Sequence, residues 1–241
     1  MKAAIAALTV GLGLAAHAGV ASAKGCHSRS HIVGHDSCHT FGAGWEPPMI
    51  TWGFEGVFLH FDPGGGSYDL VDKNATHYHF QTIGSTKINA FAGRYRYQLG
   101  WRGYYLADEF TFGGTVSGPG LEGGPVTSPG SAMADALSPV SSASGFTFEW
   151  DLALGKQVSV GRLFYAAELA GGVRVVSYNT GYPLVSPIAT AGLIEPRLRG
   201  GLWLNHWLSV TAFAGANVLS TGDYEVGISL GLHAIPYDGS R

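Results

Sequence analysis

The residues best suited to metal chemistry lie near the start of the chain, where positions 26–39 read CHSRSHIVGHDSCH. Four histidines recur there every fourth residue, at His27, His31, His35 and His39, and two cysteines, Cys26 and Cys38, lie in the same stretch. Imidazoles and thiolates are ligands that zinc prefers, normally four to an ion. On a helix, a four-residue spacing would place all four imidazoles on one side. The stretch is therefore a candidate metal site.

The segment before this stretch indicates which compartment it meets. Residues 1–23 contain one basic residue, Lys2, then small and apolar residues, and they end in Ala21-Ser22-Ala23. This is the pattern of a secretory signal peptide with an A-x-A cleavage site. We predict cleavage after Ala23 and export of the remaining chain.

In an oxidising compartment, the two cysteines are expected to pair with each other rather than to bind metal. A Cys26–Cys38 disulfide would close a short loop and stabilise it by about 3 kcal/mol. Gly34 opposes a helix within the stretch, and the sequence contains no C-x-x-C-H pattern for haem attachment. We predict a disulfide-closed loop and hinge over residues 24–48, weak metal binding by the histidines at most, and no cofactor.

The composition argues against several classes of protein. The chain carries 14 Lys and Arg against 17 Asp and Glu and has no basic patch, so nucleic-acid binding is not expected. No run of 18 apolar residues follows the signal segment, so no transmembrane helix is expected. Charged residues make up only 13% of the chain. So little charge is unusual for a soluble secreted protein, which needs a charged surface to remain monomeric.

Apolar residues alternate with polar or small ones in eight runs, which is the period of β-strands. The runs cover residues 50–61, 88–99, 102–114, 145–154, 162–178, 193–204, 206–218 and 223–233. Short turns are predicted around residues 99–101, 155–161 and 205–206. The links 62–87, 115–144 and 179–192 are long, and 115–144 is expected to be largely irregular with a helical turn near Met133–Leu137. Short turns at one end and long loops at the other are typical of outer-membrane barrels.

One face of these runs is apolar and the other carries charge of both signs. In residues 194–204, Leu198 and Leu202 share one face, while Glu195, Arg197 and Arg199 share the other. Sorting the runs in this way collects Glu55, Arg94, Arg96, Glu109, Glu149, Asp151, Glu168, Arg174, Glu195, Arg197, Arg199 and Glu225. The cations of this set are all arginine, whose guanidinium fork suits carboxylates in confined sites. We predict an ion-pair network inside a narrow barrel over residues 49–241, with the apolar face toward lipid.

Two further features bear on the membrane. Aromatic residues fall near predicted strand ends, as in an interfacial girdle, at Trp52, Tyr104, Tyr105, Tyr165, Tyr178, Trp203, Trp207 and Tyr224. Asp108 shares its face with Leu106 and Phe110, so either a bulge shifts the register there or Asp108 lies beyond the bilayer. A soluble periplasmic or secreted sandwich or barrel, with its charged face in water or a ligand in its interior, stays open as an alternative.

The eight runs between Ile50 and His233, together with the signal peptide, resemble the small eight-stranded outer-membrane barrels of Gram-negative bacteria, of the outer-membrane protein A transmembrane-domain and attachment-invasion-locus type. The strings CHSRSHIVGHDSC and GLHAIPYDGSR look like exported proteins of myxobacterial type. The resemblance implies an all-β fold, an eight-stranded antiparallel up-and-down transmembrane barrel. The chain departs from it by continuing through Pro236 to Arg241, where such barrels usually end in Phe or Tyr.

The expected role is structural. Because side chains just fill an eight-stranded barrel, we expect the charged network to be non-catalytic. We predict a monomer in outer-membrane lipid whose loops 62–87 and 115–144 contact an unidentified surface partner. A second alternative is a lipid A-modifying enzyme, for which His77 and His79 were weighed with Ser85 and Asp72, although the sequence does not position these as a triad.

Overall fold

The computed structural model describes residues 50–101, 103–126, 138–140, 145–160, 162–182, 185–205 and 208–234. Its strands are β1 (Ile50–Phe61), β2 (Ser67–Val71), β3 (His77–Ile83), β4 (Ile88–Trp101), β5 (Tyr104–Ser117), β6 (Gly120–Val126), β7 (Ser138–Val140), β8 (Gly145–Val160), β9 (Leu163–Tyr178), β10 (Ile188–Asn205), β11 (Leu208–Ala216) and β12 (Tyr224–Ala234). The predicted signal peptide, the disulfide loop with its histidines, the helical turn near Met133–Leu137 and Trp207 lie outside the described residues.

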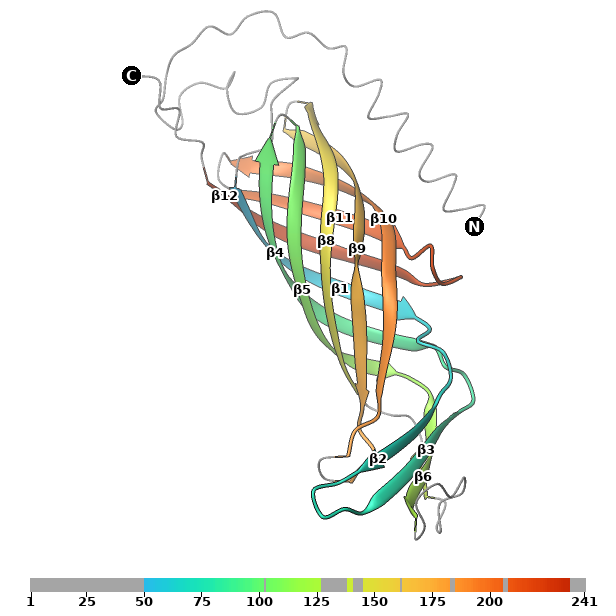
Figure 1. Ribbon diagram of the computed structural model, residues 1–241. Coiled ribbons are helices and arrows are strands. Elements are labelled where there is room, and N and C mark those ends of the chain that lie inside the picture. Colours follow the sequence, from blue (N-terminus) through green and yellow to red (C-terminus); the bar gives the residue numbers. More distant parts are fainter. Residues whose placement is uncertain are drawn as a thin grey trace, which may run out of the picture.

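Within the described part of the chain, eight strands close into an antiparallel barrel in the order β1-β12-β11-β10-β9-β8-β5-β4 (Figure 1). The first strand closes it, because β1 pairs with β12 on one side and with β4 on the other. Every barrel strand therefore has two neighbours, and no barrel edge is left open to pair with another chain. The predicted all-β fold with an eight-stranded antiparallel barrel is confirmed.

The two ends of the barrel differ in their connections. We call the end of the barrel where β4 leads into β5, β8 into β9 and β10 into β11 the short-turn end, and the opposite one the long-link end. Two of the predicted turns are displaced, because β4 continues to Trp101 and β8 continues to Val160. In β8, Gln157 and Ser159 face inward and alternate with Lys156 and Val158, so the two-residue period continues beyond Leu154. The turn after β4 contains Gly103, whose φ of 81° favours glycine.

The prediction that residues 115–144 are largely irregular is wrong for most of the described residues of this link, 115–126 and 138–140. With part of the 62–87 link, they supply a second antiparallel sheet in the order β2-β3-β6-β7, which we call the outer sheet. Figure 1 shows it beyond the long-link end of the barrel. β6 has the sequence GLEGGPV, which is poor in strand-forming residues, but it pairs with β3 from His77 opposite Val126 to Ile83 opposite Gly120. Pairing with a better strand thus overrides the local preference.

Candidate functional site

All twelve charged residues of the predicted network lie inside the barrel, and none of them is more than 7% exposed. They comprise the acids Glu55, Glu109, Glu149, Asp151, Glu168, Glu195 and Glu225 and the arginines Arg94, Arg96, Arg174, Arg197 and Arg199. Strict alternation along each strand delivers them to one face. We call this set the charged layer.

Arg94 on β4 connects three other strands across the lumen. Its Nη1 donates to Glu225 Oε1 on β12 at 2.9 Å, and its Nη2 donates to Glu149 Oε1 on β8 at 2.7 Å. Its Nε donates to Thr111 Oγ1 on β5 at 2.7 Å. Nearly the whole fork of this guanidinium is therefore used, which is what a fully buried cation requires.

Arg197 on β10 is the second cross-lumen connection. Its Nε lies 2.7 Å from Glu225 Oε1 and 3.1 Å from Glu195 Oε1. Its Nη1 contacts Glu109 and lies 3.3 Å from Asp151 Oδ1. One guanidinium thus holds acids from β5, β8, β10 and β12 together, so removing it would leave several buried charges without a partner.

Arg96 and Arg199 bind the part of the charged layer nearer the short-turn end. Arg199 Nη1 donates to Glu55 Oε1 and its Nε to Glu168 Oε1, both at 2.7 Å. Arg96 Nη2 donates to Glu168 Oε2 at 2.8 Å. Tyr105, placed by sequence in the aromatic girdle, instead points inward and donates its hydroxyl to Glu168 Oε2 at 2.8 Å. Tyr105 lies four residues before Glu109 on β5, and this even spacing along a strand predicts that both side chains face the lumen.

The charged layer holds seven carboxylic acids and five arginines, two more acids than cations. Two acids have gaps in their hydrogen bonding, because Asp151 Oδ2 and Glu195 Oε2 are buried and have no hydrogen-bond partner among the described residues, and the same holds for Arg174 Nη2 and Arg197 Nη2. Buried polar atoms without partners are uncommon in folded proteins. Asp151 and Glu195 are therefore the acids that the arginines satisfy least.

An apolar cluster fills the lumen between the charged layer and the outer sheet. We call it the apolar plug; it consists of Val57, Leu59, Phe61, Ile88, Ala90, Leu121, Val176, Tyr178, Ala189 and Phe213. The two regions meet where the Arg174 guanidinium lies 4.6 Å from the Phe61 ring centre and that of Arg199 lies 4.3 Å from the Phe213 ring centre. Sequence reasoning missed the plug, although Val57, Leu59 and Phe61 share the inward parity of Glu55 on β1.

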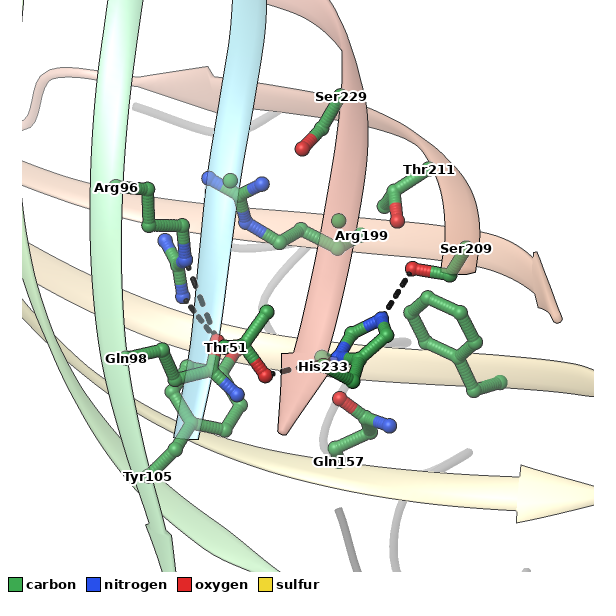
Figure 2. Close-up of a pocket in the computed structure, with 14 residues that line it drawn as sticks. Thr51, Arg96, Gln98, Tyr105, Gln157, Arg199, Ser209, Thr211, Ser229 and His233 are labelled. Atoms are coloured by element: carbon green, nitrogen blue, oxygen red, sulfur yellow. Dashed lines mark hydrogen bonds between the residues drawn. The ribbon is translucent and has the colours of Figure 1, made fainter. Parts of the chain in front are cut away.

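At the short-turn end, the lumen contains a small cavity of about 40 Å³. Figure 2 shows His233 at its wall, hydrogen-bonded through Nδ1 to Thr51 Oγ1 at 2.9 Å and through Nε2 to Ser209 Oγ at 2.8 Å. Trp203, another residue of the predicted girdle, is 1% exposed, and the centre of its ring lies 4.4 Å from the centre of the His233 ring. A cavity of this size has room for water molecules but not for an organic ligand.

The outward face of the barrel is almost entirely apolar. The most exposed large residues include Phe91 (63%), Leu154 (63%) and Ile228 (68%). Trp52, Tyr104, Tyr165 and Tyr224 of the predicted girdle are on this face, whereas Tyr105, Tyr178 and Trp203 are buried inside. The girdle assignment is wrong for these last three, because their strand parity takes them into the lumen.

Asp108 is the acid that the sequence places on the same face as Leu106 and Phe110, and it does lie on the outward face of the barrel, with Leu106. No bulge occurs around it, since the β4–β5 register runs without a shift from Ala90 opposite Thr115 to Trp101 opposite Tyr104. The bulge alternative is therefore wrong. The Asp108 carboxylate instead accepts a hydrogen bond from Trp150 Nε1 at 2.9 Å, so this charge has a partner on the neighbouring strand.

The outer sheet contains a hydrogen-bonded chain that sequence reasoning did not find. His79 Nδ1 lies 2.7 Å from Asp69 Oδ1, and His79 Nε2 lies 3.4 Å from Ser67 Oγ. The residues weighed beside His79 in the sequence were Ser85 and Asp72, and neither of them is its partner here. Asp72 caps the turn between β2 and β3, and the pKa of its carboxyl is lowered by hydrogen bonds from the backbone of Thr76 and Asn74.

Comparison with family models and with curated proteins finds no match. The chain is similar in structure to Neisserial surface protein A, with a TM-score of 0.48 and 5% identity over 77% of this chain and 96% of that one. It is also similar to Ail, the attachment invasion locus protein of Yersinia pestis, solved with the heparin analogue sucrose octasulfate. There the TM-score is 0.39 and the identity 12%, over 77% of this chain and 95% of that one.

The described residues lack two further features. They contain no group of three or more His, Cys, Asp or Glu side chains placed to hold a metal ion. They also contain no helix that is long and apolar enough to cross a membrane. The four histidines at residues 27–39 lie outside this part of the chain, so their metal binding stays a prediction.

Proposed function

We propose that the chain is an outer-membrane β-barrel protein that crosses the bilayer with its eight barrel strands. One observation carries this proposal: the charged side chains face the lumen and the large apolar ones face outward. Soluble proteins bury residues such as Phe54, Phe91 and Ile228, and they rarely expose a continuous apolar surface around the whole molecule. Lipid is the solvent that suits such a surface.

The interior supports a barrel that does not conduct. The apolar plug, the charged layer and the small cavity at the short-turn end follow one another along the lumen. Ion pairs across the barrel replace the aqueous channel of a larger barrel. This filling also speaks against the alternative of a soluble ligand-binding barrel, because the described interior offers no space for a ligand of ordinary size.

We also propose that the outer sheet is the part that meets a surface partner. It is built from the two long links, projects beyond the barrel end, and exposes Val71 (58%) and Ile83 (37%). In outer-membrane barrels the long loops are extracellular and the short turns periplasmic. The outer sheet would then stand outside the cell, where a structural or adhesive contact is made.

A pair of variants tests the membrane proposal. Ile228→Arg places a charge in the middle of the apolar belt, opposite Gly56 and Ala212, and Val71→Arg places the same charge on the outer sheet. In a bilayer, Ile228→Arg should lower the free energy of unfolding by about 2–4 kcal/mol, while Val71→Arg should change it little. The readout is urea unfolding in lipid vesicles, followed by the shift between folded and boiled bands on gels. Equal stability of the two variants, or a wild-type chain that fractionates as soluble, would contradict the proposal.

Cysteine labelling tests the orientation. In a chain whose native cysteines are replaced by serine, Lys73→Cys lies in the β2–β3 turn and Lys156→Cys lies near the short-turn end of β8. A membrane-impermeant maleimide added to intact cells should label Lys73→Cys and spare Lys156→Cys until the cells are lysed. The reverse pattern would place the outer sheet in the periplasm and end the surface-contact proposal.

A further inference from the structure

The strand register of the β2–β3 hairpin brings a serine, a histidine and an aspartate onto one face. Asp69 lies directly opposite His79, and Ser67 lies two residues from Asp69 on the same strand and opposite Gln81. Side chains two residues apart on a strand share a face, and the diagonal cross-strand distance is within reach of an imidazole. The three side chains therefore meet above the same surface of the outer sheet.

Their hydrogen bonds fix the chemistry of the imidazole. The Asp69 carboxylate is an acceptor only, so the atom at 2.7 Å from it, His79 Nδ1, carries the proton. In the neutral ring this leaves Nε2 as the acceptor, 3.4 Å from Ser67 Oγ. A nucleophile next to a base that is itself oriented by a third group is the arrangement that activates a serine, and such contacts are often long before substrate binds.

We propose that Ser67, His79 and Asp69 form a hydrolytic site for carboxylic esters on the outer sheet, with Ser67 as nucleophile, His79 as general base and acid, and Asp69 as positioning residue. The proposal does not depend on the membrane proposal, because the three residues lie outside the barrel strands. It assigns a chemical activity to a surface for which we have so far proposed only a contact.

The reaction balances with water as the sole co-reactant. Ser67 Oγ attacks the ester carbonyl carbon while His79 Nε2 takes the hydroxyl proton. The carbon–oxygen bond to the leaving group then breaks, and His79 returns the proton to the departing alcohol, which leaves an acyl group on Ser67. Water, deprotonated by His79, attacks the acyl carbonyl and releases the carboxylic acid, and the proton returns to Ser67. Asp69 holds the ring in the required tautomer throughout.

The surroundings of the three residues suit small, soluble esters. Gly124 of β6 lies opposite His79, so no side chain occupies that neighbouring position of the sheet. The Asp69 side chain is 81% exposed, whereas that of His79 is 13% exposed. The start of β2 is held by two hydrogen bonds, from Gly66 N to Thr82 Oγ1 at 2.9 Å and from Thr82 N to Gly66 O at 3.0 Å. The serine is thus fixed in position on an open face rather than in a deep cleft.

The test uses the full chain folded in an ester-free detergent. A fluorophosphonate probe should label the wild-type protein, and hydrolysis of p-nitrophenyl acetate should be faster than with the Ser67→Ala variant. Ser67→Ala should lose labelling completely, and His79→Gln should lower both rates about 100-fold or more, the contribution of a general base. Asp69→Asn should lower the hydrolysis rate, and Asp69→Glu should restore part of it, as a positioning carboxylate requires.

Matched controls separate the site from generic reactivity. Ser85→Ala removes a serine of the next loop, and His77→Gln removes the neighbouring histidine, which lies opposite Val71 instead of an acid. Both controls should behave as the wild type. The proposal is overturned if the wild-type chain is not labelled, if Ser67→Ala keeps the label, or if His77→Gln and His79→Gln lose the same amount.

Discussion

The charged layer and the outer sheet use the same kinds of side chain in opposite surroundings. In the charged layer four of the five arginines meet two or more buried acids, as Arg94 does with Glu149 and Glu225. On the outer sheet, His79 meets one aspartate, Asp69, whose side chain is 81% exposed. Buried charges must be paired because the interior cannot solvate them. Exposed ones keep water and substrates within reach, so the first arrangement holds the barrel together and the second is free to react.

The largest effect is expected where the charged layer loses a cation that several acids share. Arg197→Met removes a cation that contacts Glu109 and Glu225 among other acids. Breaking a buried ion pair in this way costs about 3–5 kcal/mol of the free energy of unfolding. Urea unfolding in vesicles should show this loss, while Lys156→Met, which removes an exposed cation lying 5.4 Å from the Tyr104 ring centre, should change stability by less than about 1 kcal/mol. If both variants lose the same free energy of unfolding, burial of the charged layer is not the reason for its contribution to stability.

The apolar plug should be nearly as sensitive, for a different reason. Leu59 is fully buried in it, and Leu59→Ala should cost about 2–5 kcal/mol through lost burial and the cavity that remains. The same unfolding assay measures the loss. In planar bilayers the wild-type chain should show no ion conductance, and conductance by the wild type would contradict a lumen sealed by the plug.

Within the charged layer, the acids should not be equivalent. Asp151→Asn and Glu195→Gln remove surplus charge from residues that each have an oxygen without a partner, so each should change stability by less than about 1 kcal/mol. Glu109 contacts Arg94, Arg96, Arg197 and Arg199, and Glu109→Gln should cost about 3–5 kcal/mol. Unfolding of the three variants side by side measures this contrast, and equal costs would show that the surplus is balanced by something other than these arginines.

The smallest effect is expected in the outer sheet, at Asp72 in the turn between β2 and β3. The pKa of Asp72 lies below its usual value because the carboxylate accepts backbone hydrogen bonds from Thr76 and Asn74. Its contribution to the β2–β3 turn is therefore complete above the usual value of 3.8 and is lost as the pH falls through the lower pKa of the folded turn. Hydrogen exchange of the Thr76 amide, corrected for intrinsic rates, should lose protection over that range. Asp72→Asn should show no such pH dependence, and an identical profile would contradict the assignment.

Much of the barrel could be predicted from the sequence, because strict alternation leaves only two faces to choose between. The parity that groups Glu195, Arg197 and Arg199 is the same one that the folded β10 uses. Nearness to a strand end predicts the wrong face for Tyr105, Tyr178 and Trp203, whereas the position that each has in the alternation of its strand predicts the inward face that they occupy. The outer sheet was missed because its glycine-rich β6 becomes a strand through pairing with β3, which no local pattern records.

The sequence by itself determined which charged side chains face the interior and which apolar ones face outward, since the period of two in a strand allows only two faces. Only the tertiary structure decided which acid meets which arginine, because Arg94, Glu149 and Glu225 come from strands that closure of the barrel brings together. It likewise decided that His79 meets Asp69 and Ser67 rather than Asp72 and Ser85, since that choice depends on the register of a hairpin. A shift of one residue in the pairing of β2 with β3 would place His79 on the opposite face of the sheet from Asp69 and Ser67.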